Sequence, residues 1–220
     1  MTRKALIALA AAAPLALAAC TDPAMMGGPE QNRTRDGAIL GGVLGAAAGL
    51  AGSDDEDRGR NAVIGAALGA GAGAAIGNRL DRQEAALRAD LGDGRIQIEN
   101  TGEVLIVRMP QDILFALNSA DLQPGIVPDL RAVAANLNRF PDGTVDVIGH
   151  TDNTGAASFN LELSQRRAQS VANVLTGAGV PQGRLRVIGV GDDRPRASNL
   201  SPEGRALNRR VEIVIRPSSG

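Results

Sequence analysis

The sequence predicts a mixed α/β (α+β) fold in its C-terminal half, a two-layer βαβαβ sandwich with helices packed on one sheet, preceded by a Gly-rich helical hairpin. Three patterns lead to this prediction. Short runs of apolar residues are typical of strands, other apolar residues recur at helical spacing between those runs, and glycine recurs at every fourth position of the N-terminal half. The 28 glycines among 220 residues concentrate in that first half, so the two halves differ in kind.

The first twenty residues have the pattern of a bacterial lipoprotein leader. Two basic residues precede an apolar run from Ala5 to Ala18, and Cys20, the single cysteine of the sequence, follows it. The run is too short to span a bilayer comfortably, so we interpret residues 1–19 as a signal peptide. The tetrapeptide LAAC resembles a lipobox, whose Cys is acylated and becomes the first mature residue. The alternative is a spare thiol in a discarded leader.

The residue that follows the cysteine bears on the destination of the protein. Position 21 is Thr, whereas Asp there would, in the enterobacterial sorting pattern, indicate retention at the inner membrane. We therefore expect Cys20 to carry palmitate-type chains in the outer membrane, with the rest of the protein on the periplasmic face. Several acyl chains, at about 0.8 kcal/mol per CH₂, would make the anchor effectively permanent. Residues 20–36 are polar and lack an apolar period, which predicts a lipidated flexible tether.

Residues 37–77 contain an internal repeat. GAILGGVLGAAAGLAG (37–52) and NAVIGAALGAGAGAAIG (61–77) superpose at an offset of 24, each with Gly at every fourth position. Aligned glycines form a groove through which helices can approach closely, and the pattern resembles the glycine-zipper segment of YiaD-like outer-membrane lipoproteins. A Gly/Ala-rich spacer is the alternative. Each half would rise only about 24 Å against a hydrocarbon core of about 30 Å, so a two-pass membrane span is marginal.

The remaining segments predict the order of elements in the C-terminal half. We expect a solvated turn at 53–61, and a linking helix at 78–94 with its leucines on one face. From residue 95 the expected elements are a hairpin at 96–107, an amphipathic helix at 126–140, a strand at 145–148, a helix at 160–176, a strand at 185–190, a short helix at 202–207 and a strand at 211–215.

One stretch, GHTDNTGAASFNLELSQRRA (149–168), carries the charges of a candidate binding site. It places a carboxylate, Asp152, in a Gly-bounded loop and a guanidinium, Arg167, fifteen residues later on the expected helix. Such a pair could hold a ligand with both an amino and a carboxylate group, because a charge-assisted bond at each end fixes orientation as well as affinity. The alternative is an Asp that caps its own turn and an Arg that faces water.

Four ordered motifs carry a resemblance to a known family. GHTDNTG, then Asn160 with LSQRRA, then GVGDDRP and finally GRALNRRVEI together resemble the OmpA/Pal/MotB family of peptidoglycan-binding domains, over about a hundred residues. The resemblance implies that residues 95–220 form an OmpA-like domain and that Asp152 and Arg167 hold the diaminopimelate of the stem peptide. It implies that Thr151, Asn160 and Leu163 line the same pocket. Asn118 falls where many relatives carry Asp or Asn near the ligand.

The resemblance implies an outer-membrane lipoprotein that binds peptidoglycan non-covalently and tethers the outer membrane to the cell wall. An alternative makes the glycine zipper the active part, as a homo-oligomer or pore-like membrane protein that the wall-binding domain merely localises. A stator subunit like MotB would need a membrane helix with a proton-carrying carboxylate, and both Gly-rich halves lack an internal charge. Arg209 and Arg210 alternate faces on the last strand, so only one can face the ligand, and the sequence leaves open which.

Other chemistries are disfavoured. A net charge of −1 and the lack of Trp and Tyr argue against nucleic acid as a partner. The single histidine, His150, has no thiol or second His beside it, so we expect neither metal nor cofactor. Members of the family that the sequence resembles accept Tyr at this place, which implies a loop-packing residue. A hydrolase built on Asp146 and Asp152 would need one raised pKa, whereas Arg167 would lower it. The pair Asp192-Asp193 supplies too few oxygen ligands for Ca²⁺. We therefore expect no enzyme.

Overall fold

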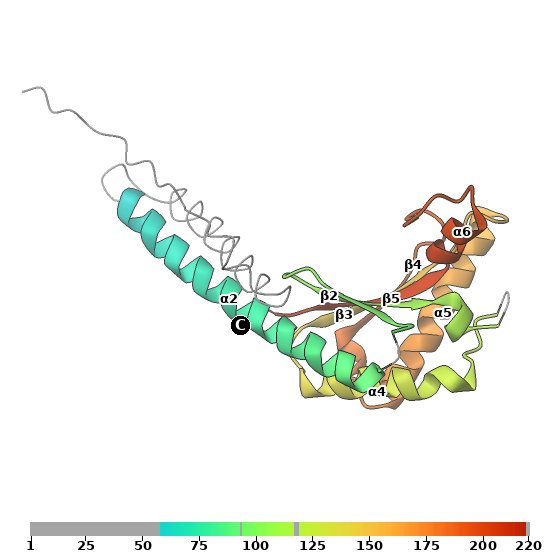
Figure 1. The fold of residues 1–220 in the computed structure, drawn as a ribbon, viewed down its shortest axis with the longest axis horizontal. Coiled ribbons are helices and arrows are strands. Elements are labelled where there is room, and N and C mark those ends of the chain that lie inside the picture. The colour runs from blue at the N-terminus through green and yellow to red at the C-terminus, as the bar shows by residue number, and fades with distance from the viewer. Residues whose placement is uncertain (1–57, 93, 117–118, 219–220) are drawn as a thin grey trace, which may run out of the picture.

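A computed structural model describes residues 58–92, 94–116 and 119–218. The elements follow one another as α2 (Arg58–Leu91), β1 (Gln97–Asn100), β2 (Leu105–Pro110), α3 (Gln111–Leu114), η2 (Pro124–Ile126), α4 (Val127–Arg139), β3 (Thr144–His150), α5 (Ala157–Gly177), η3 (Gln182–Arg184), β4 (Leu185–Gly189), α6 (Pro202–Asn208) and β5 (Arg210–Arg216). The mixed α/β architecture with helices packed on one sheet is confirmed (Figure 1). The lipidation residue Cys20 and the tether lie outside the described residues, as does Asn118.

The sheet has five strands in the order β1-β2-β5-β3-β4. The β1–β2 hairpin is antiparallel, β5 pairs antiparallel with both β2 and β3, and β4 runs parallel to β3. The last strand of the chain is therefore the central one. Its Ile213 lies opposite Val107 on one side and Val147 on the other, which aligns the apolar residues of three strands on one face.

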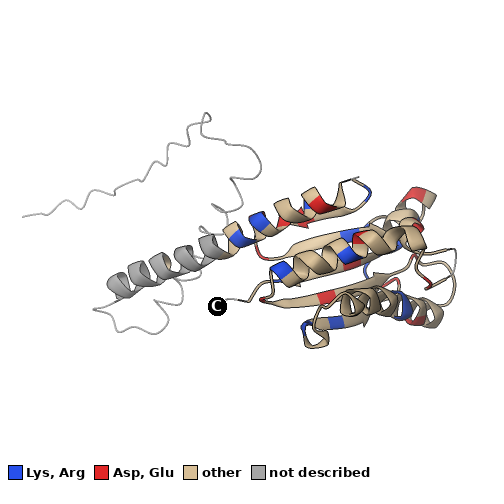
Figure 2. Cartoon of the chain, turned by 90° about the horizontal axis from the view of Figure 1, so that it is seen from below, with Lys and Arg blue, Asp and Glu red and all other residues tan. Residues whose placement is uncertain are grey.

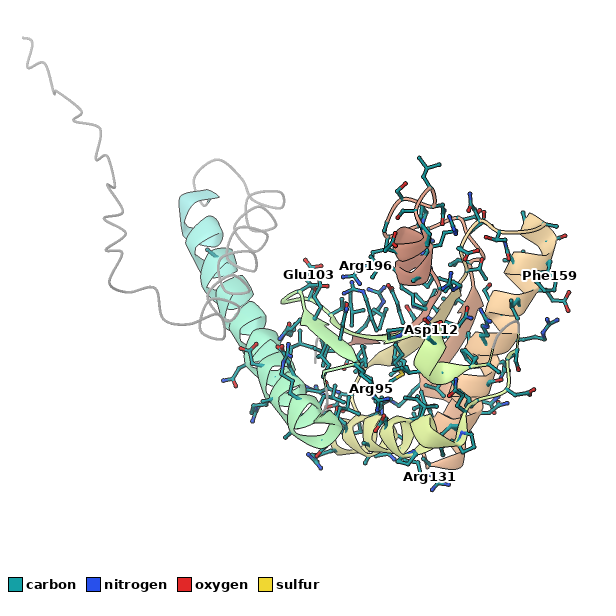
Figure 3. The ribbon with its side chains drawn as sticks, turned by 45° about the vertical axis from the view of Figure 1, so that its right-hand side comes forward. Arg95, Glu103, Asp112, Arg131, Phe159 and Arg196 are labelled. Atoms are coloured by element: carbon teal, nitrogen blue, oxygen red, sulfur yellow. The ribbon has the colours of Figure 1, made fainter. Side chains whose placement is uncertain are left out.

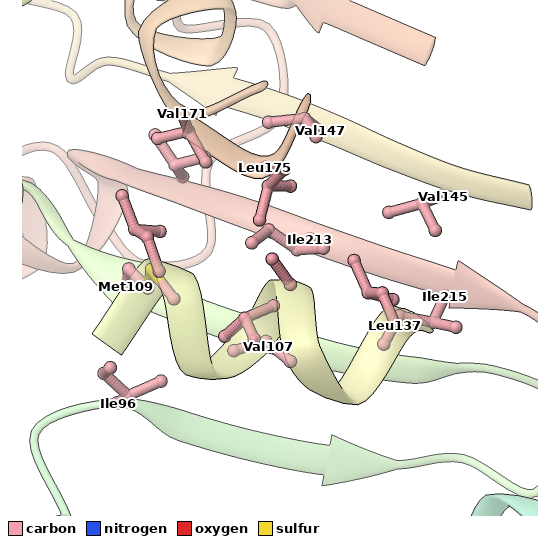
Figure 4. Close-up of a cluster of buried hydrophobic side chains, with 14 of the residues drawn as sticks. Ile96, Val107, Met109, Leu137, Val145, Val147, Val171, Leu175, Ile213 and Ile215 are labelled. Carbon is pink, nitrogen blue, oxygen red and sulfur yellow. The ribbon is translucent and has the colours of Figure 1, made fainter. Parts of the chain in front are cut away.

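Two helices cover this apolar face. Leu130, Val133 and Leu137 of α4 are completely buried, as the predicted amphipathic spacing requires. Leu175 of α5 is completely buried too, and the side chains of both helices meet Val107, Val147 and Ile213 of the sheet (Figure 4). Helix α6 lies on the other side of the sheet from α4 (Figure 1), near the end where β3 and β4 finish.

Helix α2 differs from the sequence interpretation in where it begins and in its continuity. It begins at Arg58, so the last four residues of the expected turn at 53–61 are helical. It then runs without a break from the second Gly-rich repeat into the segment expected as a linking helix. Leu80, Leu87 and Leu91 belong to the hydrophobic core of the sheet domain, because this end of α2 packs on α4 and β1. Figure 2 shows charges of both signs along the same part of the helix.

Two glycines set the distance between α5 and the sheet. A Cβ on Gly149 of β3 would lie 2.1 Å from the carbonyl oxygen of Ser164, and one on Gly189 of β4 would lie 2.5 Å from the backbone nitrogen of Gln165. The helix backbone therefore rests directly on the ends of both strands. The Ser164 hydroxyl secures this contact by accepting a hydrogen bond of 2.9 Å from the backbone N–H of Gly191.

Candidate functional site

The loop after β3 positions the carboxylate of Asp152. Its Oδ1 accepts a 2.9 Å hydrogen bond from the backbone N–H of Thr154, closing an Asx turn. The neighbouring Thr151 donates its backbone N–H to the carbonyl oxygen of Gly191 at 2.9 Å, which ties this loop to the one after β4. Asp152 is only 8 % exposed, so its orientation is fixed from both sides.

Helix α5 presents one face to that loop. Asn160, Leu163 and Arg167 lie on this face at spacings of three and four residues, and all three are buried. The Asn160 side-chain amide donates to the carbonyl oxygens of Asp152 and Thr154, both at 3.2 Å. Helix and loop are thus joined at the point where the candidate site forms.

Arg167 lies deeper than a solvent-facing helix arginine. Its side chain is 3 % exposed, with Nε donating to the carbonyl oxygen of Ser119 at 2.9 Å and Nη1 to Oε1 of Gln111 at 2.7 Å. The guanidinium carbon is 5.3 Å from the ring centroid of Phe115, a cation–π distance. Burial, together with the nearby charge of Arg209, lowers the pKa of Arg167 to about 10. The group stays cationic at neutral pH.

The structure at the start of β5 shows which of the neighbouring residues Arg209 and Arg210 faces the site. Arg209 Nη1 donates to Oδ2 of Asp152 at 2.8 Å. Arg210 points to the opposite side of the sheet, where its Nε donates to Glu212 at 2.7 Å. The direct partner of Asp152 is therefore Arg209, and the expectation that Arg167 lies beside this carboxyl and lowers its pKa is wrong.

Hydrogen bonding keeps the site carboxylate ionised. Burial alone would raise the pKa of Asp152, but the hydrogen bonds from Arg209 and from Thr154 outweigh it and hold the pKa below its usual value. A carboxyl that stays ionised at neutral pH is suited to bind a cation and unsuited to donate a proton as a general acid.

These side chains converge on one cavity of about 310 Å³. The residues that line it are Gln111, Thr151, Asp152, Thr154, Phe159, Asn160, Leu163, Arg167, Arg205 and Arg209. The side chain of Phe159 at the N-terminal end of α5 (Figure 3) is 47 % exposed, so it lies at the rim. The Thr151 hydroxyl is buried and has no hydrogen-bond partner among the described residues. An unpartnered buried hydroxyl in a cavity wall is a ready contact for a ligand.

The structure brings five of the six sequence-predicted site residues to this cavity, and the sixth, Asn118, lies outside the described residues. Four lining residues were not predicted from the sequence, namely Gln111, Thr154, Phe159 and Arg205, and the side faced by Arg209 was left open. Both arginines stand in the GRALNRRVEI motif, so a closer analysis of that motif could have found them. Nothing in the sequence near Gln111 indicates that its amide will meet Arg167.

Asp146, considered above for a hydrolase, and His150, expected to pack in a loop, both belong to strand β3, where His150 pairs with Arg210 of β5. Asp146 lies on the opposite face of the sheet and accepts hydrogen bonds from Arg186 and Arg216 at 2.7 and 3.1 Å. His150 ends β3 and is 3 % exposed, with neither ring nitrogen hydrogen-bonded among the described residues. Within the described ranges, no group of three or more His, Cys, Asp or Glu side chains could hold a metal ion.

A second cavity of about 430 Å³ lies beside the first, between α6 and β2. Its arginines already have partners: Arg108 pairs with Glu212 at 3.2 Å, Arg210 with the same carboxylate at 2.7 Å, and Arg196 donates to Gln97 at 2.9 Å. The smaller cavity holds the Asp152 carboxylate, the Arg167 guanidinium and the buried Thr151 hydroxyl that has no partner among the described residues, so we place the candidate site there.

Fold and site together define a ligand-binding domain for a small charged ligand. The comparisons with known proteins agree with this class. Residues 114–209 match the OmpA family, and residues 1–81 match the YMGG-like Gly-zipper. The chain is 41 % identical over 212 residues to the probable lipoprotein YiaD of Escherichia coli (strain K12), covering 96 % of this chain and 97 % of that protein. The chain belongs to the OmpA family, which is non-enzymatic, and the prediction that it is no enzyme is confirmed.

Other relatives share the C-terminal domain. The peptidoglycan-binding protein ArfA of Mycobacterium tuberculosis is 45 % identical over 103 residues, which cover 47 % of this chain and 32 % of ArfA. Among solved structures, the cell wall anchor of the T6SS from Pseudomonas aeruginosa is 38 % identical, with a TM-score of 0.56, covering 61 % of this chain and 97 % of that one. A putative MotB-like protein from Desulfovibrio vulgaris is 27 % identical with a TM-score of 0.61, covering 67 % and 98 %.

Proposed function

We propose that this protein is an outer-membrane lipoprotein that binds peptidoglycan non-covalently through the diaminopimelate of the stem peptide, and so tethers the outer membrane to the cell wall. The observation that carries the proposal is the convergence of the Asp152 carboxylate and the Arg167 guanidinium on one small cavity. The names of two relatives support it, since ArfA is called peptidoglycan-binding and a Legionella pneumophila relative, 34 % identical over 118 residues, a peptidoglycan-associated lipoprotein.

The charges of Asp152 and Arg167 bind different groups of the ligand. Diaminopimelate carries an ammonium and a carboxylate on the same side-chain carbon, and Asp152 takes the ammonium while Arg167 takes the carboxylate. Arg209 holds Asp152 in its ionised form, and the Thr151 hydroxyl, which has no partner among the described residues, is free to bind the ligand. Leu163 and Phe159 offer apolar surface to the methylene chain.

The anchor rests on the lipobox. Acylated Cys20 holds the N-terminus in the outer membrane, and the polar residues that follow let the domain reach the wall from the periplasmic face. The probable lipoprotein YiaD, aligned over nearly the whole chain, supports a lipoprotein. Substituting Cys20→Ser should leave an uncleaved, unacylated precursor. Mass spectrometry of the N-terminus in membrane-extracted protein decides this, and an unmodified Cys20 in the parental protein would contradict the anchor.

Sedimentation with purified sacculi tests the wall-binding proposal. Asp152→Ala and Arg167→Ala should each weaken binding to diaminopimelate-type sacculi by about 2 to 5 kcal/mol, because each leaves a ligand charge desolvated without its partner. The double variant should lose little more, because the two residues act as a unit. Arg166→Ala is the matched control, since Arg166 is on the same helix, is exposed and pairs with Glu162 outside the cavity.

Lysine-type sacculi are the second arm of this experiment. Their stem peptide lacks the side-chain carboxylate, so the parental protein should bind them weakly. Parental affinity of both alanine variants, shown folded by circular dichroism, would refute the site.

A further inference from the structure

The charges of the cavity do not balance. Three guanidinium groups line it, from Arg167, Arg205 and Arg209, against the single carboxylate of Asp152. Of the three, Arg209 is paired with Asp152. Among the described residues, no carboxylate oxygen lies within 4.0 Å of the guanidinium nitrogens of Arg167 or Arg205. Two cations without a carboxylate partner, beside an Asp152 carboxylate that keeps lone pairs free after its bonds to Arg209 and Thr154, are complementary to a ligand that presents two carboxylates and one ammonium.

Arg205 is placed to reach the same ligand as the other two arginines. It lies on α6 one helical turn before Arg209, whose backbone N–H donates to the Arg205 carbonyl oxygen at 3.0 Å. Both side chains line the cavity, as does that of Arg167 from α5. Arg205 Nη1 donates to the carbonyl oxygen of Asn199 at 3.0 Å, which holds the side chain in place while leaving its charge unneutralised.

We infer that Arg205 is a specificity-determining residue that binds a second carboxylate of the stem peptide, beyond the one held by Arg167. This rests on the proposed function. Two neighbouring groups can supply the carboxylate: the backbone carboxylate of diaminopimelate, free only where the stem peptide ends at that residue, and the α-carboxylate of the adjacent isoglutamate. The ammonium at Asp152 must also be free, so a diaminopimelate whose side-chain amine is consumed in a cross-link is a poor ligand.

Three soluble muropeptides of equal size separate the two sources. The first is the unmodified disaccharide tripeptide, the second carries an amide in place of the isoglutamate α-carboxylate, and the third carries an amide in place of the backbone carboxylate of diaminopimelate. Affinity for each is measured by calorimetry with the full mature chain. The parental protein should bind one of the two amidated ligands about fivefold more weakly than the first, as expected for the loss of one partly exposed ion pair.

The decisive comparison uses Arg205→Gln. The variant should bind the unmodified ligand about fivefold more weakly than the parental protein does, and it should no longer discriminate against the amidated one. Arg205→Lys should keep the discrimination, and Arg166→Gln should behave as the parental protein. Equal weakening of all three ligands by Arg205→Gln would show that the residue acts only through Asn199 and would overturn the inference. Unchanged affinity would overturn it as well. No binding of the unmodified ligand by the parental protein would instead refute the proposed function.

Discussion

The guanidinium of Arg209 lies 2.8 Å from the carboxylate of Asp152, across 57 residues of sequence. This ion pair connects the start of the last strand to the loop after β3, and it closes one wall of the cavity. It also uses part of the hydrogen-bonding capacity of Asp152 while leaving lone pairs for a ligand ammonium. Arg209 therefore prepares the carboxylate before any ligand binds.

Removing that partner should change the titration of the site. In Arg209→Gln the pKa of Asp152 should rise, because the hydrogen bond and positive charge that lower it are lost while burial still raises it. Binding to diaminopimelate-type sacculi should then be lost at a higher pH on acidification than in the parental protein. NMR titration of the Asp152 carboxyl carbon measures the pKa, with Arg166→Gln as the control. An unchanged pKa would contradict the role assigned to Arg209.

The close packing of α5 on the end of β3 predicts that a side chain at Gly149 destabilises the fold. In Gly149→Ala the new methyl group would meet the Ser164 carbonyl oxygen at 2.1 Å, so α5 must move away from the sheet. We expect a loss of about 2 to 4 kcal/mol in the free energy of unfolding. Gly183→Ala is the control, since nothing lies within 4 Å of a Cβ there. Chemical denaturation measures both variants, and equal stability of the two would argue against close contact at Gly149.

The buried histidine predicts how stability depends on pH. Burial and the charge of Arg210 lower the pKa of His150 from 6.5 to about 4 in the folded protein. The unfolded chain therefore binds a proton between about pH 6.5 and 4 that the folded protein does not bind. The free energy of unfolding should accordingly fall by about 2 to 3 kcal/mol as the pH drops through this window.

A variant isolates the contribution of this histidine. His150→Tyr has no group at this position that titrates between pH 4 and 6.5, so its stability should fall less steeply than that of the parental protein over the same window. Urea denaturation at a series of pH values measures both slopes. Identical slopes would mean that other groups cause the loss.

The zipper repeat makes a prediction of its own, although one of its two substituted residues, Gly45, lies outside the described residues. Replacing Gly45 and Gly69 by Leu would fill the expected groove and keep the helix backbones apart. Cross-linked oligomers of the mature protein should fall at least about tenfold if the groove contributes roughly 1.4 kcal/mol, while sacculus binding stays at the parental level. The control replaces Ala46 and Ala70 by Leu. Unchanged cross-linking in the glycine variant would favour the spacer interpretation.

No helix in the described ranges is long and apolar enough to cross a membrane.

The sequence by itself determined the main helices and strands of the domain and the identity of the site loop, but not the short helix α3 or the turns η2 and η3. Leu130, Val133 and Leu137 recur at helical spacing, and short apolar runs mark the strands, because each pattern follows from local backbone geometry. The motif around Asp152 could be recognised for a similar reason: its loop, the helix that follows and the spacing to Arg167 all lie within one short stretch of sequence.

Tertiary structure decided what depends on pairing between distant segments. The antiparallel register of β5 against β2 and β3 determines that Arg210 lies on the far face, and the turn from α6 into β5 leaves Arg209 on the cavity side. Gln111 meets Arg167 only because α3, which directly follows β2, lies beside α5. The end of α2 belongs to the core because its leucines meet α4 and β1. A one-residue shift in strand register would exchange the faces of the side chains, and no local pattern specifies that shift.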